Sequence, residues 1–193
     1  MAHKNTSRRR LLIAEEAAKL ISEGAADFHS AKQKAATRHG VTATRDLPDN
    51  LEIEQALIAR QSLFEGDQHT IMVDGLRQTT LALMTVLAKF DPHLVGGVLS
   101  GTANAFSEIQ LHVFSDDLEA VAIHLLNKNI TYRSIEKEIA DLLLPGFEFF
   151  WQGKPIELLV FDDGARISPA SPIDGKPMAR ASKAKVTALL ERG

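Results

Sequence analysis

The residues whose types and spacing most clearly suggest chemistry lie in the segment SEIQLHVF, which ends at Phe114. Its alternating apolar residues predict a buried strand over 108–114. Alternation places Glu108, Gln110 and His112 on one face of that strand, while the apolar residues between them face the core. A carboxylate, an amide and an imidazole on one face could bind a metal ion, with His112 as a further ligand, but they are equally typical of a solvated strand face.

Glycine-rich turns precede this strand in the segment VGGVLSGTANAFS. The first contains Gly96 and Gly97, and the second contains Ser100 and Gly101. A glycine turn beside polar side chains lets backbone N–H groups approach a phosphate while nearby side chains hold its metal ion. The same glycines would also serve a tight connection between two strands, so both interpretations stay open.

Other classes of site are excluded by composition and motif. The chain of 193 residues contains no cysteine, which excludes a disulfide framework, a thiolate metal site and a cysteine nucleophile. It has no P-loop, no Ser-His-Asp arrangement and no dinucleotide-binding fingerprint, and the other histidines lack metal-ligand spacing. Any metal ion would therefore be held by oxygen or imidazole ligands.

Periodicity and capping residues predict the elements that position these residues. Helices are predicted from residue 8 to a stop at Gly24, over about 28–39, from a cap at Asp49 or Asn50 to Phe64, over 68–90, from a cap at Asp116 to Asn127, and near 182–191. Strands are predicted over 94–99, 108–114, 130–135, 147–151 and 156–161, although 134–144 is equally compatible with a helix. The last two strands form a hairpin through Gly153. This order indicates an α+β fold, with a mixed sheet and flanking helices.

The glycine turn and the polar strand resemble the hallmark of the nucleotidyltransferase-like superfamily. That hallmark is a hydrophobic residue, Gly, then Gly or Ser, a spacer of about ten residues, and a carboxylate-hydrophobic-carboxylate triplet. The opening matches Val95, Gly96 and Gly97, and Gly101 falls on a second family glycine. Ser107, Glu108 and Ile109 fall where members carry Ser-Asp-Ile, and Glu157, on a later strand, matches the third acidic residue.

This resemblance, which covers roughly residues 68–162, implies a nucleotidyltransferase-like sheet preceded by an N-terminal helical extension. It implies that Glu108, Gln110 and Glu157 are the catalytic positions, with Glu108 and Glu157 as ligands of Mg²⁺ or Mn²⁺. It also implies that a nucleoside triphosphate is held by the residues of the glycine-rich segment, Gly96, Gly97, Ser100, Gly101 and Ser107. The expected organisation is an extension over 1–66, a core over 67–165 and a tail over 166–193.

Two departures from the family pattern affect the predicted activity. Glu108 replaces the usual Asp, and Gln110 carries no charge where the second carboxylate is expected. An amide oxygen can coordinate Mg²⁺ but does not neutralise it. The sequence therefore predicts either a nucleotidyltransferase with a weakened site, acting on an unknown acceptor, or a non-catalytic nucleotide-sensing or interaction module on the same fold.

The charge distribution suggests partners for the ends of the chain. Lys and Arg outnumber Asp and Glu by 9 to 5 over residues 1–47 and by 6 to 2 over 166–193, whereas 48–165 holds 7 against 18. Basic ends around an acidic centre predict contact with a nucleic acid or protein through the N-terminal helices, although ordinary solvated charge explains the pattern equally well. A helix-turn-helix regulator is a further alternative. We expect a cytoplasmic protein without a membrane contact, because no export signal or apolar span is visible.

Overall fold

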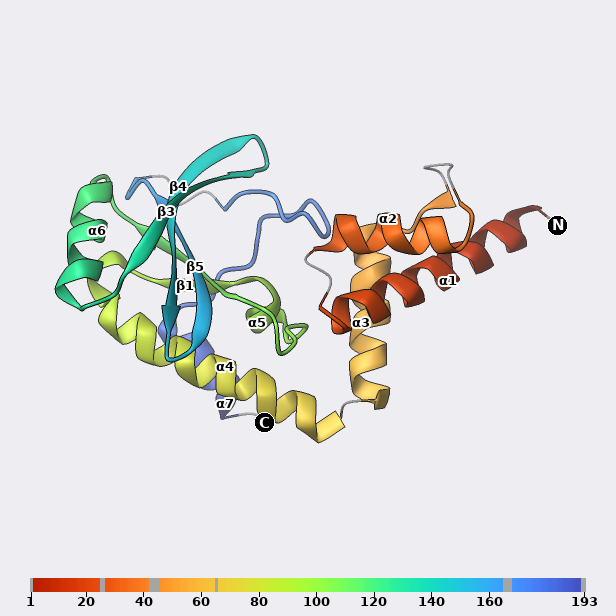
Figure 1. Cartoon of the computed structure of the whole chain (residues 1–193), viewed down its shortest axis with the longest axis horizontal. Helices are drawn as coiled ribbons and strands as arrows, with labels where there is room; N and C mark the ends of the chain where they lie inside the picture. Colours follow the sequence, from red (N-terminus) through yellow and green to blue (C-terminus); the bar gives the residue numbers. More distant parts are fainter. Residues whose placement is uncertain (1, 25–26, 42–45, 65, 165–167, 192–193) are drawn as a thin grey trace. The chain divides into compact units, whose positions relative to one another are not determined.

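A computed structural model describes residues 2–24, 27–41, 46–64, 66–164 and 168–191 (Figure 1). The chain divides into two compact units, Met1–His69 and Thr70–Gly193. The predicted boundary between 165 and 166 lies outside the described residues. No helix in the described ranges is both long and apolar enough to cross a bilayer.

The first unit consists of three helices, α1 (Ala2–Ser22), α2 (Phe28–Arg38) and α3 (Asn50–Phe64). The predicted helices at these positions are therefore confirmed. Small side chains dominate the contacts of α1 and α2, where Ala17, Ala31 and Ala35 are completely buried, and Ile53 and Leu57 contribute the apolar face of α3. Alanines allow the helices to approach one another closely without loss of side-chain entropy.

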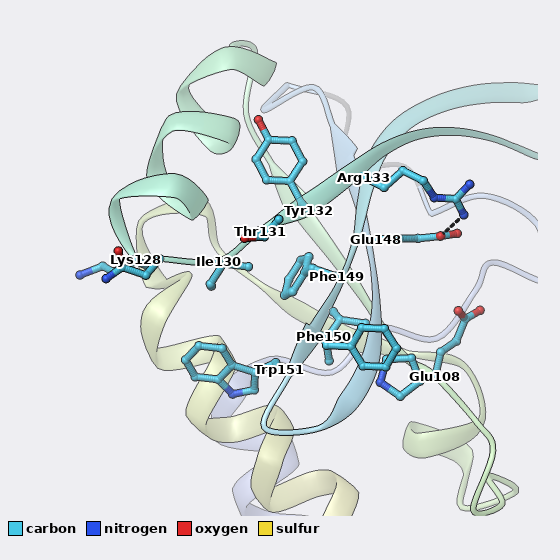
Figure 2. Close-up of a pocket in the computed structure, with 13 residues that line it drawn as sticks. Glu108, Lys128, Ile130, Thr131, Tyr132, Arg133, Glu148, Phe149, Phe150 and Trp151 are labelled. Atoms are coloured by element: carbon cyan, nitrogen blue, oxygen red, sulfur yellow. Dashed lines mark hydrogen bonds and ion pairs between the residues drawn. The ribbon is translucent and has the colours of Figure 1, made fainter.

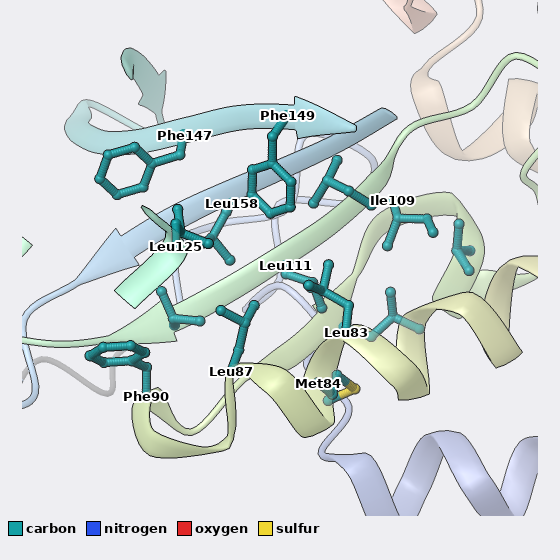
Figure 3. Close-up of a cluster of buried hydrophobic side chains, with 14 of the residues drawn as sticks. Leu83, Met84, Leu87, Phe90, Ile109, Leu111, Leu125, Phe147, Phe149 and Leu158 are labelled. Carbon is teal, nitrogen blue, oxygen red and sulfur yellow. The ribbon is translucent and has the colours of Figure 1, made fainter. Parts of the chain in front are cut away.

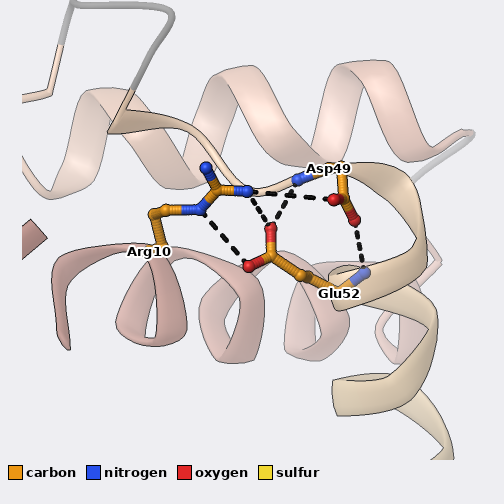
Figure 4. Close-up of polar contacts among 3 residues, drawn as sticks. All are labelled: Arg10, Asp49 and Glu52. Carbon is orange, nitrogen blue, oxygen red and sulfur yellow. Dashed lines mark hydrogen bonds and ion pairs between the residues drawn. The ribbon is translucent and has the colours of Figure 1, made fainter. Parts of the chain in front are cut away.

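Asp49 caps α3 and joins it to α1 (Figure 4). The backbone N–H of Glu52 donates to Asp49 Oδ1 at 2.8 Å, and the backbone N–H of Asp49 donates to Glu52 Oε2 at 2.7 Å. This reciprocal pair is a capping box, which satisfies two helix-end N–H groups. The guanidinium of Arg10 on α1 donates to both oxygens of Glu52, so the cap also fixes the contact between the two helices.

The second unit is a five-stranded mixed sheet with helices, which confirms the predicted α+β class. Its elements are α4 (Gly66–Val86), a 3₁₀ turn (Ala88–Phe90), β1 (His93–Val95), α5 (Gly96–Ser100), β2 (Ile109–Phe114), α6 (Leu118–Asn127), β3 (Tyr132–Ile139), β4 (Leu142–Trp151), β5 (Lys154–Phe161) and α7 (Lys183–Leu190). The strand order is β1-β2-β5-β4-β3. Only β2 and β5 are paired in parallel, which brings the start of each strand to the same end of the sheet.

One face of the sheet packs against α4 and α6 and forms the main core (Figure 3). Leu83 of α4 and Leu87, just after its end, point toward Ile109 and Leu111 of β2, as Figure 3 shows, and Met84 belongs to the same cluster. All five side chains are completely buried. Because side chains alternate along a strand, the neighbouring residues of β2 and β5 must point to the opposite face, called the second face here.

Three predicted elements differ from the observed ones. The strand predicted over 94–99 stops at Val95, because Gly96 adopts a φ of 68° and begins the short helix α5. The cap of α6 is Asp117, whose Oδ1 accepts from the N–H of Ala120, whereas Asp116 Oδ1 accepts from the N–H of Asp163. Residues 134–144 are not helical, because β3 and β4 form a hairpin around a turn at residues 140–141.

The second face carries an apolar cluster near the end of β2 and β5. It consists of Phe114, Leu144, Leu159 and Phe161, with Ile135 and Ile139 packed against them. Arg180 places its guanidinium carbon 4.5 Å from the centre of the Phe161 ring. The tail is therefore folded back onto the sheet at this point, and a bridge from Ala181 to Leu94 adds to that contact.

Candidate functional site

Gln110 and Glu157 are neighbours across the parallel pair β2–β5. Their side chains lie on the second face, where Gln110 Nε2 donates a hydrogen bond of 3.0 Å to Glu157 Oε1. Glu157 is only 4% exposed, so its carboxylate depends on partners within the protein. The sequence singled out both residues, and the fold brings them into direct contact.

Lys137 is a second partner of Glu157, although it was not predicted from the sequence. Its ammonium group reaches from β3 and forms an ion pair with Glu157 Oε2. The Glu157 side chain is 6% exposed in this pair, whereas that of Lys137 is 38% exposed. Both carboxylate oxygens of Glu157 thus accept hydrogen bonds, one from an amide and one from an ammonium group.

Glu108 lies one residue before β2 and belongs to the same group. Burial, and to a smaller extent repulsion from Glu157, raises the pKa of the Glu108 carboxyl. The charge of Lys137 and a hydrogen bond from Gln110 act in the opposite direction and lower this pKa. Glu148 of β4 raises that pKa further. Glu148 faces Glu157 in the register of β4 and β5 and is paired with Arg133. We call Glu108, Gln110, Lys137, Glu148 and Glu157 the polar cluster.

The glycine turns lie beside Gln110. Gly96 has a φ of 68°, a left-handed conformation that favours glycine. A methyl group at this position would also lie 2.1 Å from Gln110 Oε1, so the close approach of Gln110 requires glycine as well. The carbonyl of Gly97 accepts hydrogen bonds from the N–H groups of Gly101 and Ala103. Gly101, with a φ of 85°, ends α5 in the left-handed conformation.

Most of the N–H groups after α5 are used within the loop itself. Ser100 Oγ lies 2.9 Å from Thr102 Oγ1, and Ser107 Oγ accepts from the N–H of Asn104. The N–H groups of Phe106 and Ser107 donate to Asn104. The part of the predicted phosphate-binding segment that follows α5 is therefore a self-bonded loop at residues 101–107, which leaves few backbone donors in that loop for a phosphate.

The polar cluster does not fit a magnesium ion in this arrangement. Mg²⁺ needs oxygen ligands with accessible lone pairs in near-octahedral geometry. The ammonium group of Lys137 pairs with Glu157 Oε2 and would repel a second cation there, and Gln110 directs its Oε1 toward Gly96. Across the described parts of the chain, no three His, Asp or Glu side chains form a group that could hold a metal ion. The ammonium group of Lys137 supplies the positive charge instead.

His112 is a structural residue rather than a metal ligand. It is 1% exposed, and its Nδ1 accepts a hydrogen bond of 3.1 Å from Arg180 Nε. Burial, with repulsion from Arg180, His93 and Lys137, lowers its pKa to about 3. The ring is therefore neutral near pH 7, and its Nδ1 lone pair is committed to the tail.

A pocket of about 700 Å³ adjoins the polar cluster, at the end of the sheet where β4 ends and β5 begins (Figure 2). Glu108, Glu148 and Arg133 line it together with the aromatic side chains of Tyr132, Phe149, Phe150 and Trp151. This pocket was not predicted from the sequence. The one sequence feature that points to this pocket is the aromatic run FEFFW at 147–151. Phe149 of this run pairs with Tyr132 across the β3–β4 hairpin.

Comparison with models of protein families, with curated proteins and with solved structures gave no match to this chain. The interpretation of the polar cluster and the pocket therefore depends on their own residues.

Proposed function

We propose that this chain is a non-catalytic nucleotide-sensing module on a nucleotidyltransferase-like fold, in which Lys137 has replaced the metal ion. The observation that carries the proposal is the arrangement of Lys137, Gln110 and Glu157, in which both oxygens of the third acidic residue are used by protein donors. The glycine turn followed by the β2–β5 pair, with Gln110 beside Glu157, supports the likeness of fold.

The charge of the polar cluster indicates which form of nucleotide it would accept. Its three carboxylates, those of Glu108, Glu148 and Glu157, face one cation of the cluster, Lys137, and one outside it, Arg133, which pairs with Glu148. One negative charge is therefore in excess when all five are ionised. A triphosphate without a cation would be repelled by this excess, so we expect nucleosides and monophosphates to bind better than triphosphates.

A second candidate function is the binding of a nucleoside triphosphate with Mg²⁺, followed by slow nucleotidyl transfer to an unknown acceptor. It is favoured by the convergence of Glu108, Gln110 and Glu157 at the start of two parallel strands. For this function a divalent cation would have to displace the Lys137 ammonium from Glu157.

Titration calorimetry with mono- and triphosphates, in EDTA, Mg²⁺ or Mn²⁺, separates the two functions. For the module, a monophosphate binds equally in all three conditions, and Gln110→Asp gains no metal binding. For the transferase, the triphosphate binds only with metal, and Gln110→Asp tightens it because a second carboxylate is added. Gln78→Asp, at an exposed position on α4, is the matched control for the added charge. The absence of a binding signal for every nucleotide would contradict both proposed functions.

Contact with a nucleic acid or protein through the basic N-terminal helices stays a prediction. Arg10 is paired with Glu52 and Arg38 with Glu16, which reduces the positive charge that these helices present. Binding of duplex DNA or RNA by the full chain, weakening steeply as salt rises, would support it.

A further inference from the structure

The pocket beside the polar cluster has the size and composition of a small-molecule site. Its volume of about 700 Å³ lies within the range that holds drug-sized ligands. It is formed by the start of β3, the end of β4 and the start of β5, together with Glu108 and the connection 128–131 that leads into β3. The strands hold their side chains in fixed positions before the ligand arrives.

Aromatic rings line the pocket on both sides of β4: Phe149 and Trp151 point to the main-core face, whereas Phe150 points to the second face, on which Glu108 also lies (Figure 2). The chain contains one tryptophan and one tyrosine, and both Trp151 and Tyr132 line this pocket (Figure 2). Phe149 is buried, whereas Phe150 is 74% exposed. An exposed phenylalanine on the rim of a pocket gains hydrophobic burial only when a ligand covers it. Flat, polarisable rings favour a planar ligand that stacks on them.

The polar part of the wall contains donors, among them Lys128 and Arg133, and two carboxylates that can accept hydrogen bonds from a ligand. Glu108 is half-buried and belongs to both the pocket and the polar cluster. An ionised carboxylate only accepts hydrogen bonds, and its two oxygens match two adjacent N–H groups. Glu148, the other acidic residue of the wall, is already paired with Arg133. Glu108 accepts a hydrogen bond from Gln110 and keeps further lone pairs for a ligand.

We propose that this pocket binds a guanine base, which stacks on Phe150 and donates its N1–H and 2-amino hydrogens to the Glu108 carboxylate. Adenine and cytosine each offer the carboxylate one amino group, and uracil offers one ring N–H, so only guanine presents adjacent donors to both oxygens. The inference rests on the proposed nucleotide-sensing function and specifies its ligand.

Guanosine is the first probe, because it carries the base without phosphates and needs no metal ion. Trp151 is the only tryptophan of the chain, so its fluorescence reports directly on the pocket. Titration with guanosine in EDTA is expected to change this fluorescence until it saturates. Adenosine, cytidine and uridine should bind with at least about ten-fold lower affinity. Inosine, which lacks the 2-amino group, should fall between guanosine and adenosine.

Two variants test the contacts. Phe150→Ala removes an exposed ring, so it should leave the fold intact. It should lower the affinity for guanosine about ten-fold, because the stacking contact is lost. Phe106→Ala is the matched control, because Phe106 is 73% exposed but does not line the pocket, and it should leave the affinity unchanged. Glu108→Gln should abolish the preference for guanosine over adenosine, because a neutral amide no longer offers two acceptors.

The outcomes separate this inference from the function on which it rests. Nucleotide binding in calorimetry that neither Phe150→Ala nor Glu108→Gln alters would overturn the pocket proposal and leave the sensing function standing. Guanosine binding with the expected losses, together with no response to any nucleotide, would support the pocket and overturn nucleotide sensing. Equal affinity for all four nucleosides would reject the role of Glu108 as a guanine acceptor.

Discussion

The ammonium group of Lys137, on β3, reaches past β4 and pairs with the buried carboxylate of Glu157, on β5. The two residues differ in environment, because Glu157 is almost completely enclosed and Lys137 keeps contact with solvent. Removal of either partner therefore has unequal consequences. A carboxylate that loses its partner stays buried and charged, whereas a lysine that loses its partner can turn toward water.

We expect Lys137→Met to lower the free energy of unfolding by about 2 kcal/mol, since it leaves Glu157 charged and without its cation. Glu157→Gln should cost about 1 kcal/mol or less, because Gln110 can still bond to the new amide. Urea denaturation at pH 7 measures both values. The double variant Lys137→Met/Glu157→Gln should recover most of the unfolding free energy that Lys137→Met loses. If the losses of the two single variants simply add, the two residues are not coupled.

The second prediction concerns Glu108, whose pKa is raised mainly by burial and then by repulsion from Glu157. A carboxyl whose pKa is higher in the folded state stabilises the fold below its unfolded pKa, and this contribution is lost as pH rises through the folded pKa. Glu108→Gln should therefore be more stable than the wild type at pH 7 and equal to it below about pH 4.5. Chemical denaturation across this range tests the sign, with the exposed Glu138→Gln as the control.

The sequence predicted the fold class well because the elements are marked by local patterns. The apolar stripe of α4, the alternation of β2 and the capping residue of α3 each depend on a few neighbouring residues. The strand over 94–99 was wrong for an equally local reason. Val98 and Leu99 continue the apolar pattern beyond Gly96, but the positive φ of Gly96 turns the chain into α5 after three strand residues.

The partners within the site were harder to predict because they come from pairings between distant strands. Gln110 and Glu157 could be placed on strands, but their contact depends on the register of β2 with β5. Lys137 lies in a segment for which helix and strand were equally compatible, so its direction could not be derived. The aromatic wall required the pairing of Tyr132 with Phe149, which only the β3–β4 hairpin establishes.

The third prediction is that His112 makes the protein sensitive to acid. Its pKa is lowered to about 3, so the unfolded chain takes up a proton below about pH 6.5 that the folded protein does not. Stability should fall by up to about 1.4 kcal/mol per pH unit from this residue as pH drops toward 5. His112→Asn keeps an acceptor for Arg180 but cannot be protonated, so its stability should fall less steeply. The exposed His39→Asn serves as the control, and equal slopes for His112→Asn and wild type would contradict the prediction.

The last prediction concerns Gly96, where the glycine turn meets the polar cluster. Gly96→Ala forces a left-handed conformation on an alanine and places its methyl group against Gln110 Oε1, 2.1 Å away. We expect a loss of about 2 kcal/mol of unfolding free energy from the combined strain and contact. Gly75→Ala is the control: it lies in α4 with no atom within 4 Å of the added methyl group, so it should stabilise by about 0.5 to 1 kcal/mol. The double variant Gly96→Ala/Gln110→Ala removes the collision but keeps the strained φ, so it should recover the part of the loss due to contact. If Gly96→Ala unfolded at the same urea concentration as the wild type, the close packing of Gln110 on this turn would be excluded.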